Sequence, residues 1–241
     1  RLALSFNHML ERIEDVFTRQ SNFSADIAHE IRTPITNLVT QTEIALSQSR
    51  SQQELEEVLY SNLEEFSRMS RMVSDMLFLA QADNNQLIPE QRALDLAEEV
   101  NKVFEFFEAW AEEKEVALRF VGSHCRVIGD PLMLRRAISN LLSNAIRYTP
   151  AGQAVTIQLS ESAEKIRLVV ENPGAPIAAE HLPRLFDRFY RVDPSRQRKG
   201  EGSGIGLAIV KSIVSAHHGS VAVQSDPRST RFIIVLPKYA Q

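Results

Sequence analysis

Apolar residues recur at alternating spacings of three and four along residues 1–82. One stripe runs through Leu10, Ile13, Phe17, Ile27, Ile31, Leu38 and Ala45. A second stripe runs through Leu55, Leu59, Asn62, Phe66, Met69, Val73, Met76 and Ala80. A repeat of about 3.5 residues puts one narrow stripe on each helix, as in coiled coils and helical bundles. Because the segment 47–51 between the stripes is short and polar, the pattern predicts an antiparallel helical hairpin.

This hairpin has too little apolar surface to be stable alone. The side chains of two stripes cannot offset the conformational entropy lost when both helices become ordered. A second copy of the hairpin would supply the missing surface, and four helices would then share one core. We therefore predict a homodimer that is held together by a four-helix bundle.

The periodicity ends at residues 83–93, which carry Pro89, and we place a domain linker there. Beyond it, short alternating runs separate longer helical patterns. Asp130-Pro131 supplies a helix cap followed by proline at the first helical position. The expected helices are 95–114, 131–148 and 204–218, and the expected strands are 116–121, 125–128, 153–160, 165–171, 220–225 and 231–236. The second half is thus predicted to be an α/β sandwich with mixed or antiparallel strands, which makes the whole an α+β protein of two domains.

Composition narrows the possible functions. The 241 residues carry a net charge of −4, which argues against a basic face for nucleic acid. A single cysteine, Cys125, excludes an internal disulfide framework and a multi-cysteine zinc site. No run of 18 apolar residues is present, so we expect no membrane span. The chain begins at Arg1 within a helical pattern and without a signal peptide, so we expect it to be part of a longer protein.

The first candidate site is centred on His29. At about 100° per residue, His29 lies about 200° around the helix from Ile27 and Ile31, so it should project outward. A neutral imidazole is a fair nucleophile near its ordinary pKa of about 6.5. Glu30 could take the proton that leaves the ring, and Thr33 follows one turn later on the same face. The alternative is a surface histidine beside an ordinary glutamate–arginine pair.

The second candidate site lies on the helix predicted at 131–148. Asn140 and Asn144 are one turn apart and share a face, and Arg147 adds a fixed positive group. Asparagine offers an oxygen to Mg²⁺ and an amide N–H to phosphate. The alternative is a pair of polar residues on a solvated face.

The third candidate site is rich in glycine. Gly200, Gly202, Gly204 and Gly206 are four of the nine glycines of the chain. Such glycines let backbone N–H groups approach a polyphosphate at the start of a helix. The spacing fits neither a dinucleotide fingerprint, since Leu207 occupies the last position, nor a P-loop. The alternative is a flexible loop.

An aromatic and basic segment precedes these glycines. Residues 186–191 read Phe-Asp-Arg-Phe-Tyr-Arg, and Arg196, Arg198 and Lys199 follow. The cations could face phosphate charge, and the aromatic rings could hold a mobile flap in place. The alternative is a packing cluster followed by a solvated basic loop.

Taken together and in this order, the segments resemble the sensor histidine kinases of two-component systems. The H box is 23–34, the N box 140–148, the F box 186–191 and the second glycine box 202–206. The resemblance extends from about residue 20 to residue 237. Residues 1–18 look like the end of a HAMP relay helix. That helix, with the runs 21–29 and 78–85, is most similar to the copper- and silver-responsive heavy-metal sensors.

The resemblance implies two domains. A dimerisation and phosphotransfer domain would span 19–88, and an ATP-binding domain of the Bergerat (GHKL) type would span 93–238. His29 would receive the γ-phosphoryl group of ATP and pass it to an aspartate of a response regulator. Glu30 would act as general base, and Thr33 would orient water in the reverse phosphatase step. The chain would be the cytoplasmic part of a bacterial inner-membrane protein that is anchored through a preceding N-terminal part.

The resemblance also implies a site for ATP and Mg²⁺. Asn144 matches the Mg²⁺ ligand, Asn140 supports it, and Arg147 matches the basic residue that faces phosphate. The other implied nucleotide-binding positions are Tyr148, Asn172, Gly174, Arg191, Gly202, Gly204, Gly206, Leu207 and Thr230. Phosphoryl transfer depends mainly on positioning and charge stabilisation, which suits this set of residues.

The first glycine box departs from the family pattern. The family usually has Asp-x-Gly-x-Gly, whereas residues 172–176 read Asn-Pro-Gly-Ala-Pro. The later Gly-Thr box is replaced by Ser229-Thr230. Asn172 could accept from the amino group of adenine through its oxygen and donate to the neighbouring ring nitrogen through its amide. We therefore expect ATP to be preferred over GTP, but less sharply than with a carboxylate.

Two other classes of protein remain open. One is a signalling adaptor that binds nucleotide without turnover, and the other is an ATP-driven clamp of the same superfamily, such as a chaperone or a mismatch-repair protein. The enzyme is favoured over the adaptor because the sequence retains His29, Asn144 and the glycines of the second glycine box. The helical hairpin that carries His29 argues against the clamp.

Overall fold

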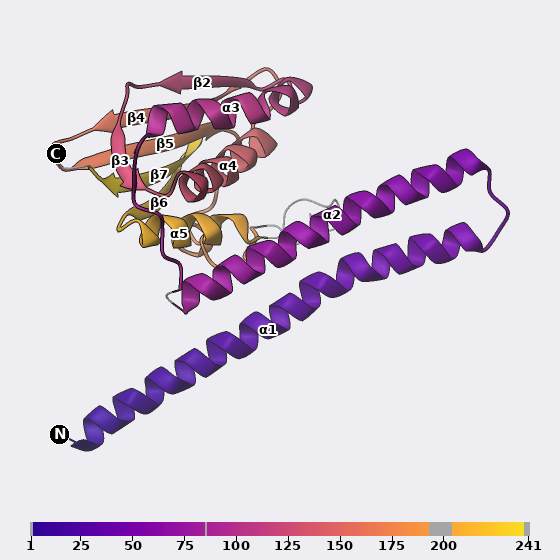
Figure 1. The fold of residues 1–241 in the computed structure, drawn as a ribbon, viewed down its shortest axis with the longest axis horizontal. Helices are drawn as coiled ribbons and strands as arrows, with labels where there is room; N and C mark the ends of the chain where they lie inside the picture. Colours follow the sequence, from indigo (N-terminus) through magenta and orange to yellow (C-terminus); the bar gives the residue numbers. More distant parts are fainter. Residues whose placement is uncertain (1, 85, 193–203, 239–241) are drawn as a thin grey trace. The chain divides into compact units, whose positions relative to one another are not determined.

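The computed structural model describes residues 2–84, 86–192 and 204–238, with the side chains of residues 2–5 and 7–23 outside that description. Leu10, Ile13 and Phe17 of the first predicted stripe are among the side chains left outside. The chain divides into two compact units, Arg1–Met76 and Leu77–Gln241 (Figure 1).

Two long helices make up the hairpin, α1 (Leu2–Leu46) and α2 (Gln52–Asp83), and α2 continues into the second unit. A capping box starts α2, because the N–H of Glu54 donates to Ser51 Oγ at 3.3 Å and the N–H of Ser51 donates to Glu54 Oε2 at 2.8 Å. The predicted hairpin is confirmed. Within the described residues, no helix is both long enough and apolar enough to cross a membrane.

The predicted stripe of α2 is only partly right. Leu38 and Ala45 of α1 and Met76 of α2 are buried, as the stripes predict. Four other members of the α2 stripe stay exposed, namely Leu55, Leu59, Phe66 and Val73.

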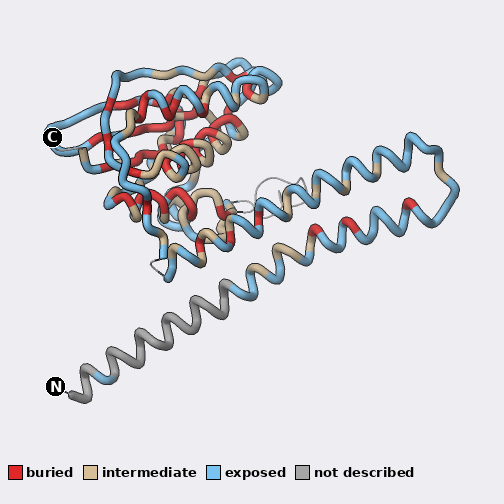
Figure 2. Tube along the Cα trace, viewed as in Figure 1, coloured by how far each residue is buried: buried red, intermediate tan, exposed pale blue. Residues whose placement is uncertain are grey.

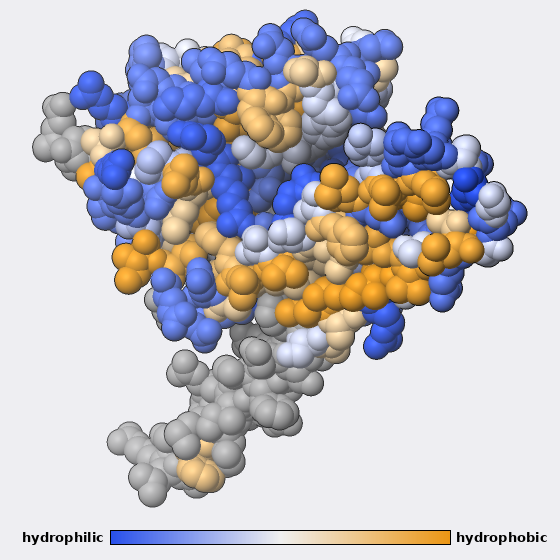
Figure 3. Space-filling model, turned by 45° about the vertical axis from the view of Figure 1, so that its right-hand side comes forward, coloured by the Kyte–Doolittle hydropathy of each residue, from blue (hydrophilic) through white to orange (hydrophobic). Residues whose placement is uncertain are grey.

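These four residues and Leu63 form a second apolar band on α2, which we call the outer stripe. Leu59 is 66% exposed and Phe66 is 56% exposed. A helix in a bundle contacts more than one neighbour, and the prediction of one narrow stripe merged two faces. Figure 2 shows that most of the hairpin beyond residue 23 is exposed, and Figure 3 shows apolar side chains gathered in bands on the molecular surface.

The second unit contains a five-stranded mixed sheet with the order β2-β4-β5-β7-β6. Its strands are β2 (Ala117–Val121), β4 (Ala154–Glu161), β5 (Lys165–Pro173), β6 (Ser220–Ser225) and β7 (Ser229–Pro237). Among the strands that the structure describes, β2 and β4 are the one parallel pair. The helices α3 (Leu96–Glu113), α4 (Pro131–Tyr148) and α5 (Gly206–Ala216) pack on one face of the sheet (Figure 1). The predicted α/β sandwich with mixed strands is confirmed.

Two short elements were not predicted. The strand β1 (Arg92–Asp95) lies at the end of the predicted linker and pairs antiparallel with β3 (Arg126–Gly129). A single turn, η1 (Leu182–Arg184), lies in the loop-rich stretch before α5. The four-residue strand β1 depends on pairing with a segment far away in the sequence, so no local pattern predicts it.

Polar contacts fix α4 against its neighbouring helices. The buried Glu99 of α3 accepts from Arg135 Nε at 2.8 Å and from Lys102 Nζ at 2.7 Å. At the start of α4, the N–H of Asp130 donates to Nε2 of the buried His217 at 2.9 Å. His217 Nδ1 lies 2.8 Å from the carbonyl oxygen of Ile213 in α5. These contacts hold α4 in a single position between α3 and α5.

Cys125 is buried beside β3. Burial raises the pKa of its thiol, and the carboxylates of Glu161 and Asp95 raise it further. The thiol is therefore protonated at neutral pH and a weak nucleophile.

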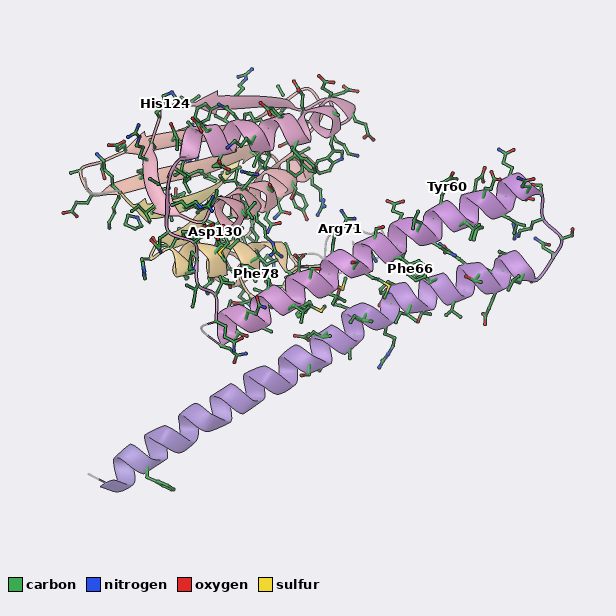
Figure 4. All side chains as sticks on the ribbon, viewed as in Figure 1. Tyr60, Phe66, Arg71, Phe78, His124 and Asp130 are labelled. Atoms are coloured by element: carbon green, nitrogen blue, oxygen red, sulfur yellow. The ribbon has the colours of Figure 1, made fainter. Side chains whose placement is uncertain are left out.

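The first testable prediction concerns the cap of α4. Asp130 Oδ1 accepts from the N–H groups of Leu132 and Met133 at 2.9 and 3.0 Å, and Oδ2 accepts from the N–H of Glu90 at 3.2 Å (Figure 4). Burial alone would raise the pKa of Asp130, but these three donors bring that pKa below its ordinary value. Asp130→Ala should lower the free energy of unfolding at neutral pH by about 1–2 kcal/mol in urea denaturation.

The same cap predicts a pH dependence. A carboxyl group whose pKa is depressed by folding stabilises above its unfolded pKa of about 3.9 and loses this effect as the pH falls through the folded pKa. The difference between wild type and Asp130→Ala should therefore shrink below about pH 4. Asp130→Asn keeps a capping oxygen that does not titrate and should lose less stability at neutral pH. If Asp130→Ala lowers the free energy of unfolding by the same amount at pH 3 and pH 7, the charge of Asp130 does not contribute to the cap.

Candidate functional site

His29 is exposed on α1, whereas Ile27 and Ile31 are half-buried, as the helical geometry predicts. Thr33 lies one turn later, with its Oγ1 at 3.5 Å from the carbonyl oxygen of His29. Pro34 lies within α1 and is buried. The imidazole is thus presented to solvent beside Glu30 and Thr33, in the first of the two units.

In the second unit, the N box meets the second glycine box where α4 packs against α5. Asn140 Nδ2 donates to the carbonyl oxygen of Gly206 at 3.2 Å. A Cβ added at Gly206 would lie 3.7 Å from Asn140 Cγ, in ordinary contact. The amide of Asn140 is therefore oriented by the first residue of α5. Leu207 follows in the first turn and is half-buried.

The F box is attached to the same glycine box. Gly204 has φ +72°, a value that L side chains rarely adopt, and a Cβ there would lie 2.9 Å from Cα of Phe189. The N–H of Phe189 donates to the carbonyl oxygen of Gly204 at 3.0 Å. Phe189 itself has φ +58°. This close backbone approach requires glycine at position 204.

Aromatic packing holds the rest of the F box in place. The ring of Phe186 meets Phe232 of β7 edge-on, with centroids 6.4 Å apart. The hydroxyl of Tyr190 lies 2.7 Å from His181 Nδ1, and the Arg184 guanidinium lies 4.3 Å from the centroid of the Tyr190 ring. Arg191 is half-buried at the end of the segment.

The first glycine box packs against the end of α4. A Cβ added at Gly174, which has φ +153°, would lie 2.8 Å from the carbonyl oxygen of Tyr148. Tyr148 is 50% exposed. Asn172 and Thr230 are buried and pair directly across β5 and β7. The structure thus brings two predicted nucleotide-binding residues, Asn172 and Thr230, side by side.

The side chain of Asn172 keeps both groups that the expected base recognition uses. One N–H of Asn172 Nδ2 donates to the carbonyl oxygen of Pro173 at 3.1 Å, and the second N–H of the amide remains. The oxygen of the Asn172 side chain remains as the acceptor. The expected two-point recognition of adenine stays a prediction.

The opposite face of the strand pair carries an ionic cluster that sequence reasoning missed. Glu171 Oε1 accepts from Ser229 Oγ at 2.6 Å and from Arg231 Nε at 2.9 Å. These two partners hold the pKa of Glu171 below its ordinary value. Only the pairing register brings the three residues together, so no local signal could have found them.

The donor set fits a nucleotide with Mg²⁺. Asn144 and Arg147 are half-buried on α4 and make no hydrogen bond or ion pair with any residue that the structure describes. Among the described residues, no side chain caps the N-terminus of α5. The first N–H groups of a helix have no partner within the helix and suit an anion. Gly202, Arg196, Arg198 and Lys199 lie outside the described residues.

Comparison with known proteins identifies both parts of the chain. Residues 19–85 match the His Kinase A (phospho-acceptor) domain, and residues 129–240 match the histidine kinase-, DNA gyrase B-, and HSP90-like ATPase family. The chain is 76% identical over 237 residues to the sensor histidine kinase CusS of Escherichia coli (strain K12), covering 98% of this chain and 49% of that protein. It is 68% identical over 242 residues to the probable sensor kinase SilS of Salmonella typhimurium, covering 99% of this chain and 49% of that protein.

The solved structures give the same result. Acinetobacter baumannii histidine kinase AdeS matches with a TM-score of 0.74 at 25% identity, covering 88% of this chain and 98% of that one. The chain spans about half the length of the curated relatives it matches. With a phosphoacceptor domain followed by an ATPase domain whose motifs meet around α4 and α5, the chain belongs to the sensor histidine kinases.

Proposed function

We propose that the chain is the kinase core of a bacterial sensor histidine kinase, in which His29 receives the γ-phosphoryl group of ATP. The convergence of motifs that are far apart in the sequence carries this proposal. Asn140 contacts Gly206, Phe189 contacts Gly204, and Asn172 pairs with Thr230. Beside them, Asn144 and Arg147 offer side chains without partners among the described residues.

The reaction is a transfer of one phosphoryl group. A ring nitrogen of His29 attacks the γ-phosphorus, the bond from that phosphorus to the β,γ-bridging oxygen breaks, and ADP leaves. Glu30 takes the proton that the imidazole loses. Arg147 and the N-terminus of α5 face the phosphate charge, and Asn144, supported by Asn140, would hold Mg²⁺. The metal, when bound, neutralises charge on the phosphates.

His29 would then pass the phosphoryl group to an aspartate of a response regulator. Membership of the family supports this partner. Thr33 would orient a water molecule for the reverse phosphatase step, since it lies one turn from His29 with its hydroxyl beside the His29 carbonyl. No role for nucleic acid is proposed, in keeping with the net charge of −4.

The core would be part of a heavy-metal sensor that responds to copper or silver. The identities to CusS and SilS support this assignment. Residues 1–18 would be the end of a HAMP relay helix, 19–88 the dimerisation and phosphotransfer domain, and 93–238 the ATP-binding domain. A preceding part of the protein would anchor this cytoplasmic core in the inner membrane.

A second copy of the chain would cover the hairpin. The outer stripe leaves five apolar residues of α2 exposed, and Ile35, Val39 and Ile44 are exposed on α1. Exposed apolar residues in such number on one hairpin are typical of an interface. A homodimer with a four-helix bundle would bury them.

Removing the phosphoacceptor tests the reaction. His29→Gln should abolish labelling by ATP that carries a radioactive γ-phosphate, while ATP affinity stays within about 0.5 kcal/mol because the residue lies in the other unit. The wild-type label should be labile in acid and stable in alkali, as expected for phosphohistidine. His124→Gln changes another exposed histidine and should keep the label. Label on His29→Gln would contradict the assignment, and a wild type that binds ATP without becoming labelled would favour the adaptor.

A charge placed in the outer stripe tests the dimer. Phe66→Lys should shift the chain from dimer to monomer in light scattering, because burying an unpaired ammonium group is unfavourable. Glu64→Lys, at an exposed and already charged position of the same helix, should remain a dimer. If Phe66→Lys remains a dimer at the same concentration, the outer stripe is not the interface.

Substitution at Asn172 tests the base pocket. Asn172→Ala should weaken ATP binding by about 1–2 kcal/mol, since it removes a buried acceptor. Asn172→Asp should sharpen the preference for ATP over GTP, because a carboxylate only accepts. Competition titration of the wild type and both variants measures these effects. An Asn172→Ala variant that binds ATP as tightly as wild type would place Asn172 outside the pocket.

A further inference from the structure

Three polar residues form a row across the ends of neighbouring strands. Asn172 of β5 pairs with Thr230 of β7, and Thr230 pairs with Ser225 of β6. Residues paired across antiparallel strands face the same side of a sheet, so the three side chains lie together. Val170 and Phe232, two residues along from Asn172 and Thr230, are buried on the same face. We call Asn172, Thr230 and Ser225 the polar row.

Ser225 links this row to the first glycine box. The N–H of Ile177, which follows that box, donates to Ser225 Oγ at 2.9 Å. Ser225 Oγ also lies 2.8 Å from Thr230 Oγ1, where either hydroxyl could donate. One serine hydroxyl therefore contacts both the loop after the box and the middle residue of the row.

The hydrogen-bond inventory allows two arrangements, and each leaves one hydroxyl proton without an acceptor among the described residues. If Thr230 donated, Ser225 Oγ would accept twice, and the Ser225 proton would have no acceptor among the described residues. If Ser225 donates, its oxygen accepts from Ile177 and its proton goes to Thr230 Oγ1. The hydrogen bond from the Ile177 N–H to Ser225 and the one from Ser225 to Thr230 then strengthen each other. The second arrangement satisfies Ser225, and a ligand that accepts from Thr230 would complete it, so every hydroxyl of the row would then have a partner.

This arrangement leaves the proton of Thr230 without an acceptor in the described part of the chain. Thr230 is 6% exposed, and a buried donor without an acceptor is costly. Asn172 lies beside it, and its side-chain oxygen accepts from no residue that the structure describes. The row therefore offers one acceptor and one donor next to each other. Adenine presents the complementary pair, an amino group beside a ring nitrogen that accepts.

Resting on the proposed function, we propose that Ser225 is a positioning residue of the nucleotide site, which fixes the Thr230 hydroxyl as a donor to the base. Ser225 itself does not touch the nucleotide. Guanine carries a proton on the corresponding ring nitrogen. A hydroxyl that is fixed as a donor would then face a second donor, which disfavours guanine. Ser225 thereby contributes to the choice of ATP over GTP.

The test measures nucleotide binding by the whole chain and needs no phosphorylation. Ser225→Ala frees the Thr230 hydroxyl to rotate and to accept from guanine. ATP affinity, measured by competition against a fluorescent ATP analogue with Mg²⁺, should fall by about threefold to tenfold. GTP affinity should fall less or rise, so the ratio of the two affinities should decrease. Ser225→Thr keeps the hydroxyl and should restore the ratio.

Ser229→Ala is the matched control. It removes another serine hydroxyl at the same end of the strand pair, but on the opposite face, where it donates to Glu171. This variant should lose stability in urea denaturation while keeping the ATP to GTP ratio of wild type. A purely structural role of Ser225 would give equal losses for ATP and GTP, and that result would overturn the proposal.

The outcome is separable from the proposed function. If wild type binds ATP but His29 is never labelled, the kinase assignment fails while the Ser225 test still decides the positioning role. If His29 is labelled and Ser225→Ala keeps the wild-type ratio, the kinase assignment stands and the role of Ser225 is excluded. A wild type that binds no ATP would overturn both.

Discussion

The nucleotide-binding unit depends on helix α4 being fixed along its whole length. At its start, Asp130 caps the helix and donates its backbone N–H to His217. In its middle, Asn140 is bonded to the first residue of α5. At its end, the carbonyl of Tyr148 lies against Gly174. Because Asn140, Asn144 and Arg147 all lie on this helix, any shift of α4 would move them together.

At the end of the sheet beside α4, the two faces of the β5–β7 pair carry different kinds of polar side chain. On the outer face, the ion pair of Glu171 and Arg231 joins β5 and β7. On the face toward the helices, the polar row consists of neutral side chains. Ionic groups tolerate solvent, and neutral donors and acceptors suit a buried site that must discriminate between two bases. The same strand pair is thus stabilised from one side and free for recognition on the other.

Much of this architecture could be predicted from the sequence. Caps and hydrophobic periodicity are local, so the hairpin, Asp130 at the start of α4, and the order of the other helices and strands were predicted, whereas β1 and η1 were not. The strand β1, the contact between Ser225 and Thr230, and the cluster around Glu171 depend on pairing between distant segments, which no window of sequence contains. The two faces of α2 were merged for a related reason, since a periodicity does not say how many neighbours a helix has.

The burial of Cys125 has a practical consequence. The Cys125 side chain is buried, and burial together with the carboxylates of Glu161 and Asp95 raises the pKa of its thiol. Thiol reagents would therefore react slowly with the native cysteine and rapidly with one introduced on an exposed surface. A spectroscopic probe could be attached near His29 and another in the ATPase unit without first removing Cys125. The movement of the two units during a catalytic cycle could then be followed directly in solution.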